Sequence, residues 1–327
     1  MQGRPKAAPP GPQRARRARA DAPAAHELRV ATLNIHKGLS QFNRRMVIHD
    51  LREGLRTLAP DLVFLQEVLG LNERHALRFA SWPHTPQYEF LAEEGWQHAY
   101  GRNAVYDHGH HGNAILSRFP ILSTANEDVS DHRFERRGLL HCVVSVPGWR
   151  KNVHCVCVHL SLHERGRRKQ LDAIAERLEE IAVRGMPIIV AGDFNDWRQR
   201  ASSILESRLG MTEVSTAHSG RAARTFPSLL PLLKLDRIYV RGFDIVSSQA
   251  HRGAPWSLLS DHLALSADLR RARARQPPGC PSRRRRRCRS RETARCAPRR
   301  SPARARGSTP LRCAAASAGC RRRIASR

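Results

Sequence analysis

The sequence predicts an α/β protein in which layered β-sheets are covered by helices. Apolar segments of strand length outnumber the helical segments, and the two kinds alternate along the chain. Most of the strand segments are too apolar to leave one face in water, so each sheet must lie between two other layers of the structure.

The first two strands are separated by a helix. Residues 28–34 follow a strand pattern and end on the polar residue Asn34. A helix follows, which Asn43 caps and Pro60 stops, because apolar residues recur between them at helical spacing. Residues 62–68 (LVFLQEV) form a nearly continuous apolar run, as is typical of a strand that is buried on both faces.

The rest of the domain predicts further strands and one long helix. The helix spans residues 164–183, and Gly185 and Pro187 end it. A polar segment with weak helix signals precedes residue 235, and residues 70–110 are mostly loop. The further strands are predicted at residues 88–91, 113–117, 139–146, 153–160, 187–192, 235–240 and 263–269.

The positive charge of the chain is concentrated at its two ends. The 327 residues carry a formal net charge of +28, of which residues 26–270 contribute only +4. Residues 271–327 hold twenty arginines and one acidic residue, and residues 1–25 are also basic and poor in large apolar residues. Because such segments bury too little surface to offset the entropy of chain ordering, we expect both to be disordered and residues 26–270 to form the domain.

The arginine-rich tail, residues 271–327, has two interpretations. Its arginine run would bind nucleic acid or any other polyanion by counterion release, without sequence preference. Alternatively, the tail is a missense extension of a GC-rich reading frame, which a comparison of nucleotide sequences would decide. The choice of substrate therefore cannot rest on the tail.

The cysteines indicate a reducing compartment, and the hydropathy indicates a protein without a membrane span. Cys142, Cys155 and Cys157 lie in apolar runs and are expected to be buried thiols, whereas the five cysteines of the tail match no zinc-binding spacing. No stretch approaches the roughly 18 to 20 apolar residues of a membrane span, and no signal peptide follows the N-terminal arginines. We expect a soluble, cytoplasmic monomer.

Polar residues that are unusual in an apolar setting stand at the ends of the predicted strands. Ligands of α/β sheets bind at such edges, and a buried ionisable group must be paired, metal-bound or neutralised. Each residue alone is adequately explained as a turn former or a packing residue; their recurrence is what predicts a site. They are Asn34, Glu67, His159, Asp193, Asn195, Asp236, Asp261 and His262.

Read in order, the motifs around these residues resemble the endonuclease/exonuclease/phosphatase superfamily over about residues 28–270. They read TLNIHKG, LQEV, GNAILSRFP, VHLS, AGDFND, LDRIYV and SDH, and the intervening segments are similar to a bacterial branch of that superfamily. The resemblance implies a four-layer α/β sandwich, with two packed mixed β-sheets flanked by helices. It also implies a metal-dependent hydrolase of phosphoric esters.

Mg²⁺, or Mn²⁺ in its place, is the expected cofactor. Glu67 is the best candidate ligand, because Mg²⁺ prefers hard carboxylate oxygens and keeps several water molecules. The resemblance implies that Asn34 orients Glu67 or the phosphate, and that Asp261 adds a ligand or a hydrogen bond. At His36 some members of the superfamily carry an acidic ligand, which puts a second strong Mg²⁺ site in doubt.

Five residues are predicted to carry the hydrolysis. His262 fits a general base or an electrostatic role, and the resemblance implies that Asp236 orients its ring. Asp193 and Asn195, two residues apart in a segment taken as extended, are expected to project the same way and to contact the same water and phosphate. The sequence leaves three roles open for Asp193: it accepts the proton, binds the metal or positions the water. His159 matches superfamily members in which a histidine contacts phosphate or protonates the leaving group.

Substrate contacts are predicted at the edge of the cleft. The resemblance places Asn113, His111 and Arg102 there, although ordinary loop polarity explains these residues equally well. Phe226 could stack on a base or sugar, but an aromatic residue before proline is more often a packing residue.

Three functions remain open from the sequence. The first is a metal-dependent phosphodiesterase acting on nucleic acid or on a phospholipid-like diester. The second is a phosphatase of inositol phosphates or other small phosphomonoesters that uses the same residues. The third, of a different class, is a catalytically silent, arginine-rich nucleic-acid-binding protein, which would require that one of the core positions be lost, whereas all are present.

Overall fold

The computed structural model describes residues 27–131 and 135–272. Apart from Arg271 and Ala272, the two basic segments that the sequence predicts to be disordered lie outside the described residues. None of the helices in these two ranges is long and apolar enough to cross a membrane.

Two mixed six-stranded sheets form the centre of the fold, as predicted. In both, one pair of neighbouring strands is parallel and the other pairs are antiparallel. The first sheet has the order β11 (Phe243–Ala250), β12 (Leu265–Arg271), β1 (Glu27–Asn34), β2 (Leu62–Asn72), β4 (Gly109–Ser117) and β3 (Gln97–Tyr106). The second has the order β5 (Ile121–Asp128), β6 (Gly138–Val144), β7 (Val153–His159), β8 (Ile188–Asp193), β10 (Asp236–Arg241) and β9 (Thr212–Glu213).

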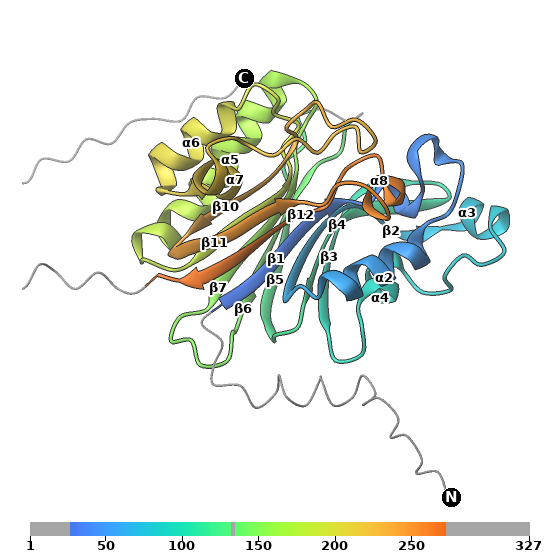
Figure 1. Ribbon diagram of the computed structural model, residues 1–327, viewed down its shortest axis with the longest axis horizontal. Coiled ribbons are helices and arrows are strands. Elements are labelled where there is room, and N and C mark those ends of the chain that lie inside the picture. The colour runs from blue at the N-terminus through green and yellow to red at the C-terminus, as the bar shows by residue number, and fades with distance from the viewer. Residues whose placement is uncertain (1–26, 132–134, 273–327) are drawn as a thin grey trace, which may run out of the picture. The chain divides into compact units, whose positions relative to one another are not determined.

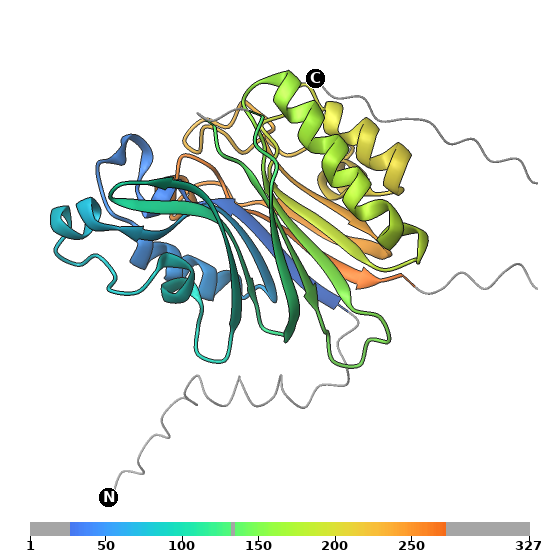
Figure 2. The same ribbon diagram turned by 180° about the vertical axis from the view of Figure 1, so that it is seen from behind.

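Helices cover the outer face of each sheet, which completes the four layers (Figure 1). The helices on the first sheet are α2 (Ile48–Leu58), α4 (Gln87–Leu91) and α8 (Trp256–Leu259). The helices on the second sheet are α5 (Glu164–Val183) and α6 (Arg200–Leu209), and Figure 2 shows α5 in light green lying along that sheet. Shorter elements lie at the margins: the 3-10 turns η1 (His36–Gly38) and η2 (Gln41–Asn43), α3 (Glu73–Arg78) and α7 (Val214–Ser219).

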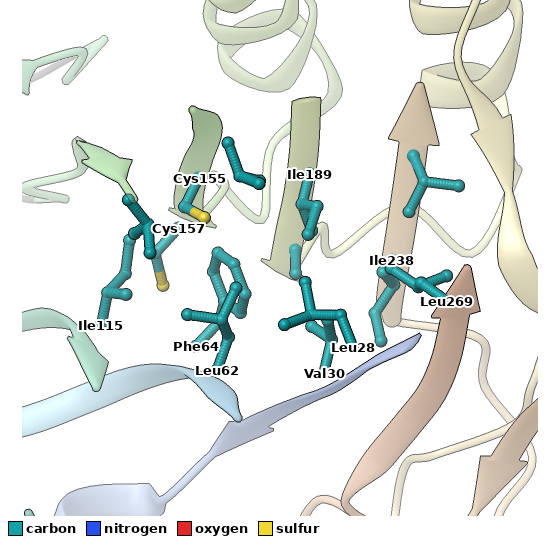
Figure 3. Packing of buried hydrophobic residues seen from close by; sticks show 14 of the residues in the cluster. Leu28, Val30, Leu62, Phe64, Ile115, Cys155, Cys157, Ile189, Ile238 and Leu269 are labelled. Atoms are coloured by element: carbon teal, nitrogen blue, oxygen red, sulfur yellow. The ribbon is translucent and has the colours of Figure 1, made fainter. Parts of the chain in front are cut away.

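The apolar character of the strands follows from burial on both faces. Along β2, Leu62 and Phe64 point into the core between the sheets, whereas Val63 and Leu65 contact the helix layer. Figure 3 shows the core between the sheets, where Phe64 and Leu62 face Ile189 and the cysteines of β7. A single β2 strand therefore contributes to two cores, which fixes its register.

Strand direction brings the polar strand ends to one edge of the sandwich. Because β1 and β2 are parallel, Asn34 lies opposite Gln66, next to Glu67. In the second sheet the parallel pair β7 and β8 sets His159 opposite Asp193, and the antiparallel β10 sets Asp236 opposite the same residue. The predicted convergence is therefore a consequence of the sheet topology.

Two predictions about local structure are wrong. Residues 88–91 are not a strand but lie in helix α4, because Gln87 and Leu91, four residues apart, are both buried after Pro86. Asn43 does not cap the first long helix, since its φ of 55° is left-handed and the helix begins only at Ile48.

Other elements were not predicted, or were predicted too short. Four strands, β3, β5, β9 and β11, have no strand signal in the sequence, and no definite helix is predicted for α3, α6, α7 and α8. The strand β4 begins four residues before the predicted 113–117 segment, at Gly109, and β2 continues past 68 to Asn72.

Candidate active site

Asp193 lies at the centre of the polar cluster. Its Oδ2 atom is 3.3 Å from Asn34 Nδ2, 3.5 Å from His159 Nε2 and 3.8 Å from His262 Nε2. One buried carboxylate thus faces two imidazoles and an amide that come from three different strands or loops. The preceding Gly192 is required here, since its φ is 149° and a Cβ would lie 1.9 Å from the Val158 carbonyl oxygen.

Asp236 holds His262 in a buried pair. The distance between Asp236 Oδ2 and His262 Nδ1 is 2.8 Å, and both side chains are almost fully buried. Burial alone would lower the pKa of His262, but the charge of Asp236 and its hydrogen bond, together with Asp193 and Asp261, raise that pKa to about 10. His262 is therefore an imidazolium at neutral pH, with Nε2 turned toward Asp193.

His159 has the opposite protonation state. Burial and the nearby charge of Arg137 lower its pKa to about 4, although Asp193 and Glu67 act to raise it. Arg137, which the sequence did not suggest, donates from Nε to the Leu160 carbonyl at 3.3 Å and pairs with Glu135 at 2.9 Å. The site therefore presents one neutral and one charged imidazole to the same carboxylate.

Glu67 reaches the cluster from a bulge. The pairing of β2 with β4 shifts between Leu65 and Val68, and Glu67 takes a φ of 55°, a left-handed conformation that is strained for a residue with a Cβ. Its Oε1 atom accepts a hydrogen bond from Asn34 Nδ2 at 3.3 Å. Such strain at a polar strand end is typical of functional sites, because the surrounding structure must maintain it.

Lys37 neutralises Glu67 in this structure. Its Nζ atom is 3.2 Å from Glu67 Oε2. Burial is the largest influence on the pKa of Glu67 and raises it, yet Lys37, His159, the Asn34 hydrogen bond and His36 together bring that pKa well below its ordinary value. Glu67 is thus a carboxylate at any working pH. Lys37 lies inside the TLNIHKG motif, but no role was predicted for it from the sequence.

The surroundings of Glu67 fit a divalent cation. Its buried Oε2 accepts no properly oriented hydrogen bond from the described residues, even though the Lys37 ammonium is close. Within residues 27–131 and 135–272, no three His, Cys, Asp or Glu side chains group to hold a metal by themselves. A site with one protein carboxylate suits Mg²⁺, which keeps several waters and shares substrate oxygens.

Asp261 lies next to His36. The distance between Asp261 Oδ1 and His36 Nδ1 is 3.4 Å, and both side chains are partly exposed. Ser260 ties this loop to β1, since its hydroxyl donates to the Asn34 carbonyl at 2.7 Å. Asn34 Oδ1 in turn accepts from the His36 backbone N–H at 3.0 Å, so the three predicted metal-site residues are linked through one short network.

Asn195 does not project beside Asp193 as expected. The chain is not extended there, because β8 ends at Asp193 and Asn195 has a φ of 48°. Its backbone N–H donates to Asp193 Oδ1 at 2.9 Å, and its side-chain Nδ2 donates to the Leu160 carbonyl at 2.9 Å. Asn195 therefore orients the Asp193 carboxylate and joins it to the end of β7.

Two of the predicted substrate residues lie against the cluster. His111 Nδ1 is 3.4 Å from the Tyr106 hydroxyl, and burial with the charge of Lys37 lowers the His111 pKa to about 4. The Phe226 ring packs on the His262 ring, with centroids 4.9 Å apart and planes tilted by 53°. Phe226 therefore packs against His262, in agreement with the packing alternative.

The other two predicted substrate residues are less directly placed. Asn113 is buried, and its Nδ2 donates to the carbonyls of Gly138 and Cys157, which ties β4 to the second sheet. Arg102 is an exposed residue of β3 opposite Gly112, and burial together with the Arg102 charge lowers the pKa of His110. Asn113 is thus a link between the sheets, and Arg102 lies beyond the central cluster.

The fold and the site define a class of protein. The family model described as the Endonuclease/Exonuclease/phosphatase family matches residues 31–262. The chain belongs to this family, whose members are metal-dependent phosphoesterases, among them nucleases and phosphatases. Family members generally use divalent metals.

Individual relatives agree with this membership. The chain is 49% identical over 242 residues to the uncharacterized protein YbhP of Escherichia coli (strain K12), covering 74% of this chain and 95% of that protein. The crystal structure of the endonuclease/exonuclease/phosphatase from Bacteroides vulgatus superposes with a TM-score of 0.61 at 19% identity, covering 75% of this chain and 99% of that one. The mannosyl-6-phosphatase Bt3783 of Bacteroides thetaiotaomicron gives a TM-score of 0.58 at 18% identity, covering 74% and 99%.

Proposed function

We propose that this protein is a phosphodiesterase that hydrolyses nucleic-acid or phospholipid-like diesters with Mg²⁺ or Mn²⁺. The observation that carries the proposal is the single Asp193 carboxylate, which faces a charged His262, a neutral His159 and the amide that contacts Glu67. Phosphoester hydrolysis needs positive charge on the phosphate oxygens, an activated water and help for the leaving oxygen. These groups can supply all three.

The cation would be held by Glu67, with Asn34 and Asp261 beside it. When bound, it would neutralise charge on the phosphate oxygens. Lys37, at 3.2 Å from Glu67, contributes further positive charge on the same side.

His262 acts electrostatically in this proposal. A histidine with a pKa of about 10 keeps its proton at neutral pH, so the general-base alternative is disfavoured and the imidazolium stabilises negative charge on the phosphate. Asp236 maintains this charged form, as the aspartate of a Ser/His/Asp triad does for its histidine.

Asp193 and His159 then act on the attacking water and on the phosphate. Asp193 is the carboxylate that lies near the Nε2 atoms of both imidazoles, so it is suited to orient the attacking water and accept its proton. The neutral His159 offers a hydrogen bond to a phosphate oxygen or to the leaving oxygen. Asn195 positions Asp193 through its backbone N–H.

The proposal is tested with the full chain on a substrate panel. Bis(p-nitrophenyl) phosphate, p-nitrophenyl phosphate, a single-stranded oligonucleotide and a phosphatidylglycerol dispersion are assayed with Mn²⁺, at a salt concentration high enough to screen the basic ends. We expect hydrolysis of a diester that EDTA and His262→Ala each abolish. His218→Ala, which removes an exposed histidine of α7, should leave it unchanged.

Two outcomes would contradict the proposal. Diester hydrolysis that survives both EDTA and His262→Ala would show that another group carries the reaction. Preference for p-nitrophenyl phosphate over every diester would make the protein a phosphomonoesterase. The structural relative Bt3783 is named as a phosphatase.

A further inference from the structure

Exposed leucines lie on one loop beside the site. We call residues 226–234 the leucine loop; it precedes β10 and runs near α8 in Figure 1. Within it, Leu229, Leu230 and Leu232 are 61%, 66% and 56% exposed, and Leu233 is also exposed. An apolar group of this size in water is unusual for a loop of a monomeric protein, and such patches mark interaction sites.

The base of the leucine loop is fixed to the site. The Phe226 ring packs on His262, and the Ser228 hydroxyl donates to the carbonyls of Ser257 and Ser260. The Ser228 backbone N–H donates to the Asp261 carbonyl at 2.7 Å. The exposed leucines therefore follow directly after a segment that several contacts hold against the site.

Other exposed apolar side chains lie at the same edge of the sheets. Leu162 and Trp197 follow the carboxyl ends of β7 and β8, Phe42 follows β1, and Leu258 precedes β12. In the described ranges, the opposite edge exposes few such residues, mainly Leu122 at the start of β5 and Val183 at the end of α5. We call the leucine loop together with Leu162, Trp197, Phe42 and Leu258 the apolar rim.

Cations are interspersed with this apolar rim. Arg221 and Arg224 precede the leucine loop and are exposed, and Lys234 ends it. Arg198 is exposed next to Trp197 and pairs with Glu164 at 3.1 Å, and the Arg44 guanidinium lies 5.5 Å from the Phe42 ring centroid. Apolar tips with cations between them match the surface of an anionic bilayer, where leucine and aromatic side chains enter the interface and basic side chains meet the headgroups.

We propose that the apolar rim docks this protein on anionic phospholipid membranes, with the site facing the bilayer. A protein partner or a second copy is less well matched, because the core of such an interface is depleted of charged residues, whereas here cations separate the apolar tips. Nucleic acid offers no apolar layer to receive leucine side chains. Membrane docking does not depend on the proposed hydrolysis. Only the further step, in which lipid phosphodiesters are the substrate, rests on the proposed function.

The test measures binding of the full chain to vesicles of equimolar phosphatidylcholine and phosphatidylglycerol by cosedimentation. It is done in about 0.5 M NaCl, where the Debye length is roughly 4 Å and attraction by the basic ends is screened. The test variant replaces Leu229, Leu230, Leu232 and Leu233 by serine. The matched control replaces Leu122 and Val183, exposed apolar residues of the opposite edge, by serine.

We expect the wild type to bind and the leucine-loop variant to lose at least about tenfold in partition coefficient, because its apolar contacts are removed. The control variant should bind as the wild type does, and circular dichroism should give all three the same melting temperature. Asp193→Asn, a site variant without a contact to the leucine loop among the described residues, should also bind normally, so that failure of docking and failure of hydrolysis can be told apart.

Three results would overturn the docking proposal. The first is wild-type binding that disappears in high salt, since the basic ends alone would then explain it. The second is equal binding by the wild type and the leucine-loop variant. The third is a concentration-dependent dimer that the serine substitutions dissolve while vesicle binding is unchanged, which would make the apolar rim an interface between copies of the chain.

Discussion

Replacing Asp236 by asparagine should disable the site while leaving its shape intact. The side chain is completely buried, and its Oδ2 atom lies 2.8 Å from His262 Nδ1. Asparagine keeps the size of the group but removes the negative charge. The burial of His262 would then lower its pKa with less opposition, although Asp193 and Asp261 would still raise it.

The magnitude follows from the pKa of His262. Its rise from 6.5 to about 10, at about 1.4 kcal/mol per pKa unit, corresponds to roughly 5 kcal/mol of preference for the charged form. Because the folded-state pKa is raised, this stabilisation is fully present below about pH 6.5 and is lost as the pH rises through about 10. Asp236→Asn should therefore cost more unfolding free energy at pH 6 than at about pH 11.

Two assays check this prediction. In the first, diester hydrolysis at pH 8 should fall by roughly ten-thousandfold, the order seen when a triad aspartate loses its charge. In the second, NMR titration of the metal-free protein should show that the His262 pKa falls toward neutrality. Asp244→Asn, an exposed carboxylate of β11, is the control. Hydrolysis within threefold of wild type, or an imidazolium that persists to pH 9 or above, would refute the reasoning.

Three further predictions concern single residues. Lys37→Met should tighten Mn²⁺ binding several-fold in calorimetry, because an ammonium 3.2 Å from Glu67 competes for the carboxylate; unchanged affinity would contradict this. Gly192→Ala should lower the unfolding free energy by about 3 kcal/mol or more, since its Cβ would lie 1.9 Å from a carbonyl oxygen; an unchanged denaturation midpoint would oppose it. Burial raises the Cys157 pKa to about 12, so this thiol should resist labelling at pH 8 until unfolding, as read by peptide mass spectrometry.

The parts of the fold that the sequence predicts are those with a strong periodic signal. Helix α5 has the predicted bounds of 164–183, because its apolar stripe and its glycine stop agree. The central strands β2, β7 and β8 are buried on both faces and so appear as apolar runs. Local pattern and tertiary environment agree in these elements.

The missed strands are those that pack on one side only or lie at an edge. β5 and β11 are edge strands with many exposed residues, so they lack an apolar run. The segment 88–91 contains a tyrosine and a phenylalanine, which favour a strand locally, but burial of Gln87 and Leu91 four residues apart makes it a helix. Tertiary packing decided these cases.

The site was predictable to the extent that its residues end strands. Asn34, Asp193 and His262 meet as expected, because strand direction in both sheets brings the end of β1, the end of β8 and the segment before β12 to the same edge of the sandwich. Arg137 carries no local signal, since an arginine in a charged loop is common. The left-handed φ of Glu67 and Asn195 was also unpredictable, because it arises from a bulge and from a loop that only long-range contacts define.

The most direct measurement of the central claim is calorimetric titration of Mn²⁺ into the wild type and Glu67→Gln. The substitution keeps the size and position of the side chain and removes only its charge. We predict one site in the wild type and a loss of affinity of at least about a hundredfold in Glu67→Gln, the upper range for loss of a supporting partner. Equal Mn²⁺ affinity in the two proteins would contradict the assignment of the cation to Glu67, and with it the account of the site.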